Sequence, residues 1–331
     1  MPGKKQQKPT QSPAKLMKAL ARRGPHRVLR GDLGIVGTPG VVFTPAEGER
    51  LPAIAFGHGW MTSVERYRDL CHHLASWGIV VAVPAGQRGL LASDDTMAAQ
   101  LRSALSIVTR VPLGFGEITV DPRKIGFAGH GFGAAAAVLA ASEGVLHGQP
   151  QPPVRGVVAL FPAPTTAQLL PAARRVSAPG LIVSAIGELD TIDGNALPLA
   201  QAYGSESAAD PRPGVVLRTP PAATSRGLIE HRSIKSLLGG NGADKKTHTA
   251  ARALTTGFLL HTLDDDSRYE AFADADADTE LGKVPAVDLD DPPEIQDKIA
   301  KLLGAKERKR RRAASPVPPR APNAVVPDTI E

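Results

Sequence analysis

Short apolar runs alternate with amphipathic stretches along most of the chain. The runs predict strands at residues 41–44, 53–56, 78–83, 124–128, 156–161, 180–185 and 215–218. The stretches between them predict helices at residues 65–76, 95–110, 132–143, 195–204 and 249–262. Because strands that alternate with helices form βαβ units, we expect an α/β fold whose mostly parallel central sheet is covered by helices on both faces.

A further short helix is predicted over residues 13–23, because Ser12-Pro13 supplies an N-cap followed by a proline at the first helical position. Leu16, Met17 and Leu20 share one face of this helix, and lysines and arginines surround them. The apolar face has two possible uses. It packs on the domain's own surface, or it rests on an anionic membrane surface.

The chain divides by residue type into four parts. Residues 1–30 form a basic segment that contains the short amphipathic helix, and residues 31–270 form the α/β domain. Residues 271–304 combine an acidic loop with a further helix, which Asp291-Pro292 would cap. Residues 305–331 are basic and proline-rich, which is typical of a disordered tail.

Charge separates the ends of the chain from its body. The net charge of +6 is the sum of +9 in residues 1–30, +5 in residues 301–331 and −8 in the 270 residues between them. Basic ends of this kind predict contact with an acidic protein or an anionic membrane surface. Specific nucleic-acid binding is not expected, because no aromatic residue interrupts the run Arg308–Arg312 to stack on bases.

The composition of the chain indicates its cellular compartment and argues against a metal site. Cys71 is the only cysteine, so no intrachain disulfide forms, and no apolar run has the length of a signal peptide core or a membrane span. We therefore expect a cytoplasmic protein, with peripheral membrane contact as the alternative. Neither a metal nor a cofactor is expected. The acidic loop has Thr279 where a calcium loop needs glycine, and Cys71, His72 and His73 are adjacent on a helix and point apart.

The strand at 124–128 is followed by Gly129-His130-Gly131-Phe132-Gly133 and then by an alanine-rich helix. This segment resembles the nucleophile elbow of α/β-hydrolases, in which a serine stands on a sharp strand-to-helix turn within the pattern G-x-S-x-G. Gly131 occupies the serine position. It has no oxygen to attack a carbonyl carbon, so the resemblance predicts an elbow whose nucleophile is missing.

The resemblance extends over residues 31–270, which look like the PET-hydrolase and cutinase-like esterases and the dienelactone-hydrolase and chlorophyllase-type proteins. Gly57-His58-Gly59-Trp60 follows a strand as the oxyanion loop of these families does. By this resemblance the backbone N–H groups of Trp60 and Phe132 would form the oxyanion hole. The same resemblance places Asp190 at the acid position. The chain order of nucleophile, acid and histidine then points to His231 as the base.

Several of these residues have a second interpretation. His58 and His130 serve the structure beside the elbow rather than proton transfer, and Arg88 likewise stabilises a turn rather than binding substrate. His231 with Asp190 is either a vestigial catalytic pair or a coincidence. Trp60 either lines a pocket or packs.

Three functional hypotheses follow. The first is a non-catalytic pseudo-hydrolase that binds an acyl or other apolar small molecule, or recruits a partner. The second is an active carboxylic-ester hydrolase of the esterase, lipase or dienelactone-hydrolase kind with a non-standard nucleophile. Ser63 and Ser142 are its candidates, or else a water activated by His231. The third is a carrier whose charged ends bind an acidic surface.

Overall fold

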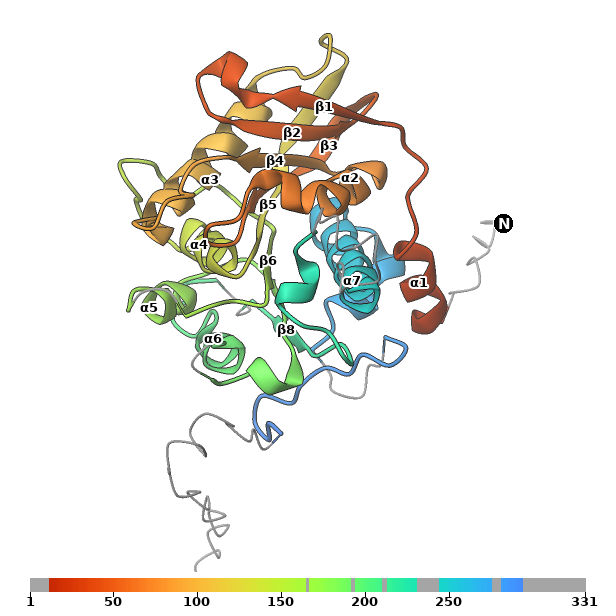
Figure 1. Ribbon diagram of the computed structural model, residues 1–331, viewed down its shortest axis with the longest axis vertical. Coiled ribbons are helices and arrows are strands. Elements are labelled where there is room, and N and C mark those ends of the chain that lie inside the picture. The colour runs from red at the N-terminus through yellow and green to blue at the C-terminus, as the bar shows by residue number, and fades with distance from the viewer. Residues whose placement is uncertain are drawn as a thin grey trace, which may run out of the picture. The chain divides into compact units, whose positions relative to one another are not determined.

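A computed structural model describes residues 12–164, 167–191, 194–209, 213–230, 244–275 and 281–293. These residues form an α/β fold on one eight-stranded sheet, with the strand order β1-β2-β4-β3-β5-β6-β7-β8 (Figure 1). β1 pairs antiparallel with β2, and β2 pairs antiparallel with β4. All other neighbours are parallel. The prediction of a mostly parallel central sheet is confirmed.

The strands lie close to the predicted apolar runs. Their bounds are Val28–Asp32 (β1), Gly40–Pro45 (β2), Gly48–Gly57 (β3), Val80–Pro84 (β4), Ile118–His130 (β5), Gly156–Leu160 (β6), Gly180–Val183 (β7) and Val215–Arg218 (β8). Every residue of β4 and β6 is buried, as expected for strands that are covered on both faces. β1 was not predicted.

The helices also follow the amphipathic stretches. They are Pro13–Leu20 (α1), Arg68–Ser76 (α2), Asp94–Arg110 (α3), Phe132–Ala141 (α4), Leu169–Arg174 (α5), Ala196–Ala202 (α6) and Lys245–Asp264 (α7). Short 3₁₀ turns are Leu33–Val36 (η1), Val64–Tyr67 (η2), Ile186–Glu188 (η3), Arg226–Leu228 (η4) and Ser267–Phe272 (η6). α7 begins before the predicted residue 249 because Asp244 caps it, accepting hydrogen bonds from the N–H groups of Lys246 and Thr247.

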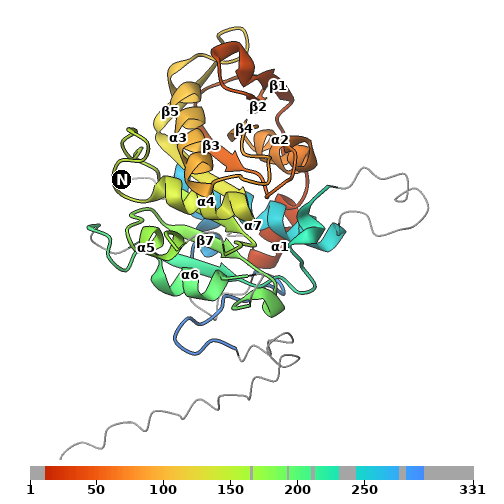
Figure 2. The ribbon, with the colours of Figure 1, turned by 60° about the vertical axis from the view of Figure 1, so that its left-hand side comes forward.

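Helices cover both faces of the sheet, as predicted. α3, α4, α5 and α6 pack on one face, and α2 and α7 pack on the other (Figures 1 and 2). Alternate residues of β3 point to opposite faces of the sheet. Ala53 and Ala55 face the first group of helices, whereas Ile54 and Phe56 face the second.

The apolar face of α1 is covered by the protein itself. Leu16 is 9% exposed and Leu20 is fully buried, and α1 packs against α7, while Lys15 and Lys18 stay exposed. Of the two uses predicted for this face, the structure therefore shows packing on the domain's own surface.

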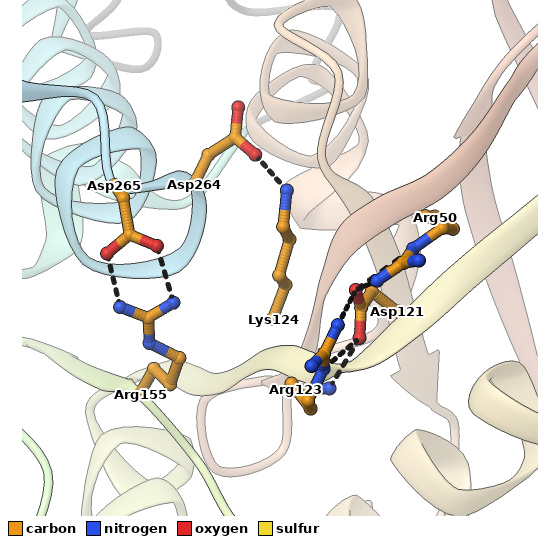
Figure 3. Close-up of polar contacts among 7 residues, drawn as sticks. All are labelled: Arg50, Asp121, Arg123, Lys124, Arg155, Asp264 and Asp265. Carbon is orange, nitrogen blue, oxygen red and sulfur yellow. Dashed lines mark hydrogen bonds and ion pairs between the residues drawn. The ribbon is translucent and has the colours of Figure 1, made fainter.

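Ion pairs hold the C-terminal end of α7 at the amino-terminal edge of the parallel strands. Lys124 Nζ in β5 lies 2.6 Å from Asp264, and the guanidinium of Arg155, just before β6, pairs with Asp265 (Figure 3). A helix of 20 residues spans about 30 Å, so the first turn of α7 lies near the opposite, carboxyl-terminal edge. The turn between β5 and α4 lies at that same edge.

The chain after η6 returns to the sheet. Leu281, Val284, Ala286 and Val287 are buried, and Ala286 forms a bridge with Arg218 of β8. The helix predicted after Asp291-Pro292 and the tail from residue 305 lie outside the described residues. Of the helices within the described part of the chain, none combines the length and apolarity needed to cross a bilayer.

Candidate functional site

Three glycines allow α4 to start directly against the sheet. A Cβ atom at Gly57 would lie 2.7 Å from the carbonyl oxygen of Gly133. A Cβ at Gly129 would overlap that same carbonyl oxygen, and one at Gly133 would overlap the Gly57 carbonyl group. Only glycine fits where two backbones approach this closely. The sequence Gly129-His130-Gly131-Phe132-Gly133 therefore forms the sharp strand-to-helix turn that its spacing predicted.

Gly131 is the N-cap residue of α4, with φ 55° and ψ −115°. This conformation is strained for any residue with a side chain. Its N–H donates to the Leu160 carbonyl at 2.9 Å, and its own carbonyl accepts from Ala134 at 3.1 Å. A Cβ placed on Gly131 would meet no atom within 4 Å, in contrast to one on Gly133. The turn thus keeps open space for a side chain that the sequence does not supply.

The predicted oxyanion donors lie on the loop after β3 and at the start of α4. Trp60 lies on the loop after β3 with 53% of its surface exposed, and Phe132 is the first residue of α4 and is buried. Neither backbone N–H donates a hydrogen bond within the described residues. Both amides therefore have capacity for an acceptor.

His130 connects the turn to two other loops. Its Nδ1 lies 2.8 Å from the Tyr67 hydroxyl, and its Nε2 lies 3.2 Å from Ser225 Oγ on the loop after β8. The Tyr67 hydroxyl also accepts the Gly59 N–H at 2.9 Å. A chain of hydrogen bonds therefore runs from the loop after β3, through Tyr67 and His130, to Ser225.

Burial keeps the His130 ring neutral. The side chain is 2% exposed, and this burial lowers its pKa to about 4. The rings of Tyr67 and Phe161 pack against the imidazole at centroid distances of 5.6 Å and 6.0 Å, which fixes its orientation. At pH 7 a neutral imidazole has one N–H and one free nitrogen, so only one of its two contacts uses a proton of the ring.

His58 links two loops at the same edge. Its Nδ1 lies 2.9 Å from the Gly59 carbonyl oxygen, and its Nε2 lies 2.7 Å from the Gly86 carbonyl oxygen on the loop after β4. Burial lowers the pKa of this ring too. Both nitrogens face backbone oxygens, an arrangement suited to holding the loops together. Arg88, on the latter loop, is exposed.

The predicted acid and base do not form a described pair. Asp190 is exposed on the loop after β7 and makes no hydrogen bond or ion pair within the described residues. His231 lies outside the described residues, so its meeting with Asp190 and Gly131 stays a prediction. On the described part of the loop after β8, the side chain that reaches the turn is Ser225.

Sequence reasoning missed Ser225 and Tyr67. Ser225 does lie on the loop after the last strand, where the predicted chain order asks for a base, but no spacing pointed to a serine there. Tyr67 and His130 are 63 positions apart and meet only through the sheet order. Chain order was therefore the one available signal, and it had been assigned to His231.

Other predicted groups lie away from the turn. Cys71 is fully buried in α2, and burial raises the pKa of its thiol well above the ordinary value. Within the described residues, no three histidine, cysteine or acidic side chains gather as metal ligands.

A concavity lies at the opposite edge of the sheet. It has a volume of about 730 Å³ and is lined by the C-terminal half of α3, by Pro122 and Ile125 of β5 and by residues 148–153. Arg102 at its base donates to four backbone carbonyls, so its guanidinium is already used by the fold. This concavity is separate from the turn at Gly131.

Neither a family model nor a curated protein matches this chain. The interpretation of the site therefore depends on its own geometry.

Proposed function

We propose that this chain is an α/β-hydrolase-fold protein without the serine nucleophile, and that it acts by binding a ligand or a partner rather than by catalysis. One observation carries the proposal. The turn that would present a nucleophile has Gly131, with open space where the side chain would stand. An ester carbonyl bound between the amides of Trp60 and Phe132 would be polarised, yet no atom of residue 131 could attack it.

The loss of a nucleophile removes most of the rate. In enzymes of this kind, removing a catalytic-triad member leaves only about 10³- to 10⁴-fold acceleration over the reaction in water. Such a remnant does not sustain metabolic turnover. The surviving framework is better suited to holding an acyl group than to hydrolysing it.

Apolar side chains support an acyl or other apolar ligand. Trp60 and Met61 on the loop after β3 are 53% and 57% exposed, and Ile186 on the loop after β7 is 58% exposed. Loops that follow parallel strands lie at one edge of a sheet, which is also the edge of the Gly131 turn. The basic ends support a partner with an acidic protein or anionic lipid surface.

The serines first considered for an active hydrolase are not favoured. Ser142 is 5% exposed and follows α4, ten helical residues beyond Gly131. Ser63 is the N-cap residue of η2 and has no histidine hydrogen-bonded to it in the described chain. Neither serine has the adjacent base that activates a hydroxyl.

Hydrolysis of p-nitrophenyl esters of increasing acyl length tests the proposal, with wild type and Gly131→Ser measured side by side. We expect wild type to show no sustained turnover at any chain length, and turnover by wild type would overturn the proposal. The Gly131→Ser variant restores the missing hydroxyl. Its turnover would show that an acid and a base still act at the turn, and its inertness would show that these have also been lost.

A further inference from the structure

We propose that Ser225 is a nucleophilic serine, deprotonated by His130, that accepts an acyl group from activated esters. This goes beyond the proposed function, because it assigns covalent reactivity to a residue outside the Gly131 position. The reaction proposed is a single acylation, not a catalytic cycle.

The geometry has the three parts that activate a serine. Ser225 Oγ lies 3.2 Å from His130 Nε2, which is hydrogen-bond distance between a nucleophile and a base. Tyr67 holds the other ring nitrogen of His130 at 2.8 Å, and the Gly59 N–H holds the Tyr67 oxygen at 2.9 Å. The base is thus oriented by a third group, as in serine–histidine pairs generally.

The protons have a consistent arrangement. The proposal requires the tautomer in which Nδ1–H of His130 donates to the Tyr67 oxygen and Nε2 accepts from Ser225 Oγ–H. Thr62 is also hydrogen-bonded to the Tyr67 oxygen, and its own hydroxyl donates to the Trp60 carbonyl.

Ser225 is more exposed than His130. Ser225 is half-buried, so a reagent reaches its oxygen from the loop side, while His130 is 2% exposed behind it. The same burial lowers the pKa of His130 to about 4, so the ring is neutral at pH 7 and acts as a weak base.

The acylation balances with an aryl ester as the acyl donor. The proton of Ser225 Oγ moves to His130 Nε2 as the oxygen attacks the ester carbonyl carbon and a new C–O bond forms. The bond from that carbon to the phenol oxygen then breaks, and His130 returns its proton to the leaving oxygen. The products are acyl-Ser225 and the free phenol, with His130 neutral again. A weak, shielded base favours a stoichiometric product, because release of the acyl group needs the same base to activate water.

A serine-directed fluorophosphonate probe tests the inference on the intact protein. We expect the labelled peptide to contain Ser225, and we expect the Ser225→Ala variant to lose the label. Ser63→Ala is the matched control, since Ser63 is also half-buried on a loop at this edge but lacks a histidine. It should label as wild type does. An unlabelled wild type, or labelling that survives Ser225→Ala, would overturn the inference.

A thiol in place of the hydroxyl gives a second measurement that does not depend on the probe. A histidine that is hydrogen-bonded to a thiol activates its sulfur as a nucleophile by accepting the thiol proton. The native Cys71 is fully buried and contributes no background. We expect iodoacetamide at pH 7 to alkylate Ser225→Cys faster than Ser63→Cys, because His130 accepts the thiol proton as the sulfur attacks. Equal or slower alkylation would contradict a base at His130.

These results are separate from the fate of the proposed function. Labelling of Ser225 without sustained ester turnover supports both statements. Absence of labelling would contradict only the proposal that Ser225 is reactive. Sustained turnover by wild type would contradict the proposal that the protein is a pseudo-hydrolase.

Discussion

Two glycines of the same turn are required for different physical reasons. Gly133 has no room for a Cβ, because the Gly57 backbone lies against it. Gly131 has room, but its φ of 55° and ψ of −115° strain any residue with a side chain. Sequence spacing predicted both glycines as parts of one turn. It did not distinguish steric contact from backbone strain, because that difference depends on β3.

Alanine substitutions separate the two causes. We expect Gly131→Ala to lower the free energy of unfolding by about 1–3 kcal/mol, the cost of a strained backbone conformation. Gly133→Ala should cost more than about 4 kcal/mol or prevent folding, since two backbones would have to move apart. Urea unfolding of the two variants measures both values. Equal losses at the two positions would contradict the described packing of α4 against β3.

The meeting of Tyr67, His130 and Ser225 shows where sequence reasoning ends at this scale. The absence of a side-chain oxygen at Gly131 is visible in the sequence itself. The sequence does not reveal the partners of His130, because Tyr67 lies just before α2 and Ser225 lies on the loop after β8. Their contact depends on the order of strands in the sheet.

At the scale of elements, Arg102 of α3 holds the C-terminal end of α4 and the following loop in place through hydrogen bonds. It is 4% exposed and donates to the carbonyls of Ala140, Ser142, Gly144 and Gln149. These four carbonyls lie at the C-terminal end of α4 and in the loop that follows it. One side chain thus supplies donors where a helix end and a loop would otherwise leave backbone oxygens without partners.

Replacement of Arg102 by methionine should be strongly destabilising. The variant keeps the apolar stem but leaves several buried or half-buried carbonyls without donors, so we expect a loss of about 3 kcal/mol or more. Arg110→Met, at the exposed end of the same helix, is the control and should stay within about 0.5 kcal/mol of wild type. Thermal or urea unfolding would show both. A small effect at Arg102 would mean that water replaces its hydrogen bonds.

Most elements were predictable because their apolar pattern is strong. β4 and β6 read as continuous apolar runs, and α3 has a serine cap with a long amphipathic face. β1 was missed because three of its five residues are exposed and polar or glycine. It is an antiparallel edge strand, defined by pairing with β2 rather than by burial. α5 was missed because its six residues make fewer than two turns.

For the whole molecule, buried histidines dominate the pH dependence of stability. Burial lowers the pKa of His73 and of His130 to about 4 each, from an ordinary value of 6.5. At these two histidines, the unfolded chain therefore binds more protons than the folded one between pH 4 and 6.5. We expect the free energy of unfolding to rise with pH across this interval, and denaturant titrations at several pH values will show it.

Glu230 opposes this trend. Its carboxylate accepts the N–H groups of Asp69 and Leu70 at the start of α2, yet burial raises its pKa to about 7 from 4.5. The folded chain holds this extra proton between pH 4.5 and 7, so this group makes stability fall as pH rises there. Glu230→Gln mimics the protonated form. Its stability relative to wild type should increase from pH 4.5 to 7, and a constant difference would contradict the raised pKa.

The central claim for the whole molecule is that it binds without catalytic turnover. The most direct measurement counts the p-nitrophenol that wild-type protein releases from an excess of p-nitrophenyl butyrate. We predict at most a single equivalent per chain, followed by no further release above the rate in buffer. Many equivalents released at a constant, esterase-like rate would contradict the account, because Gly131 offers no nucleophile to sustain them.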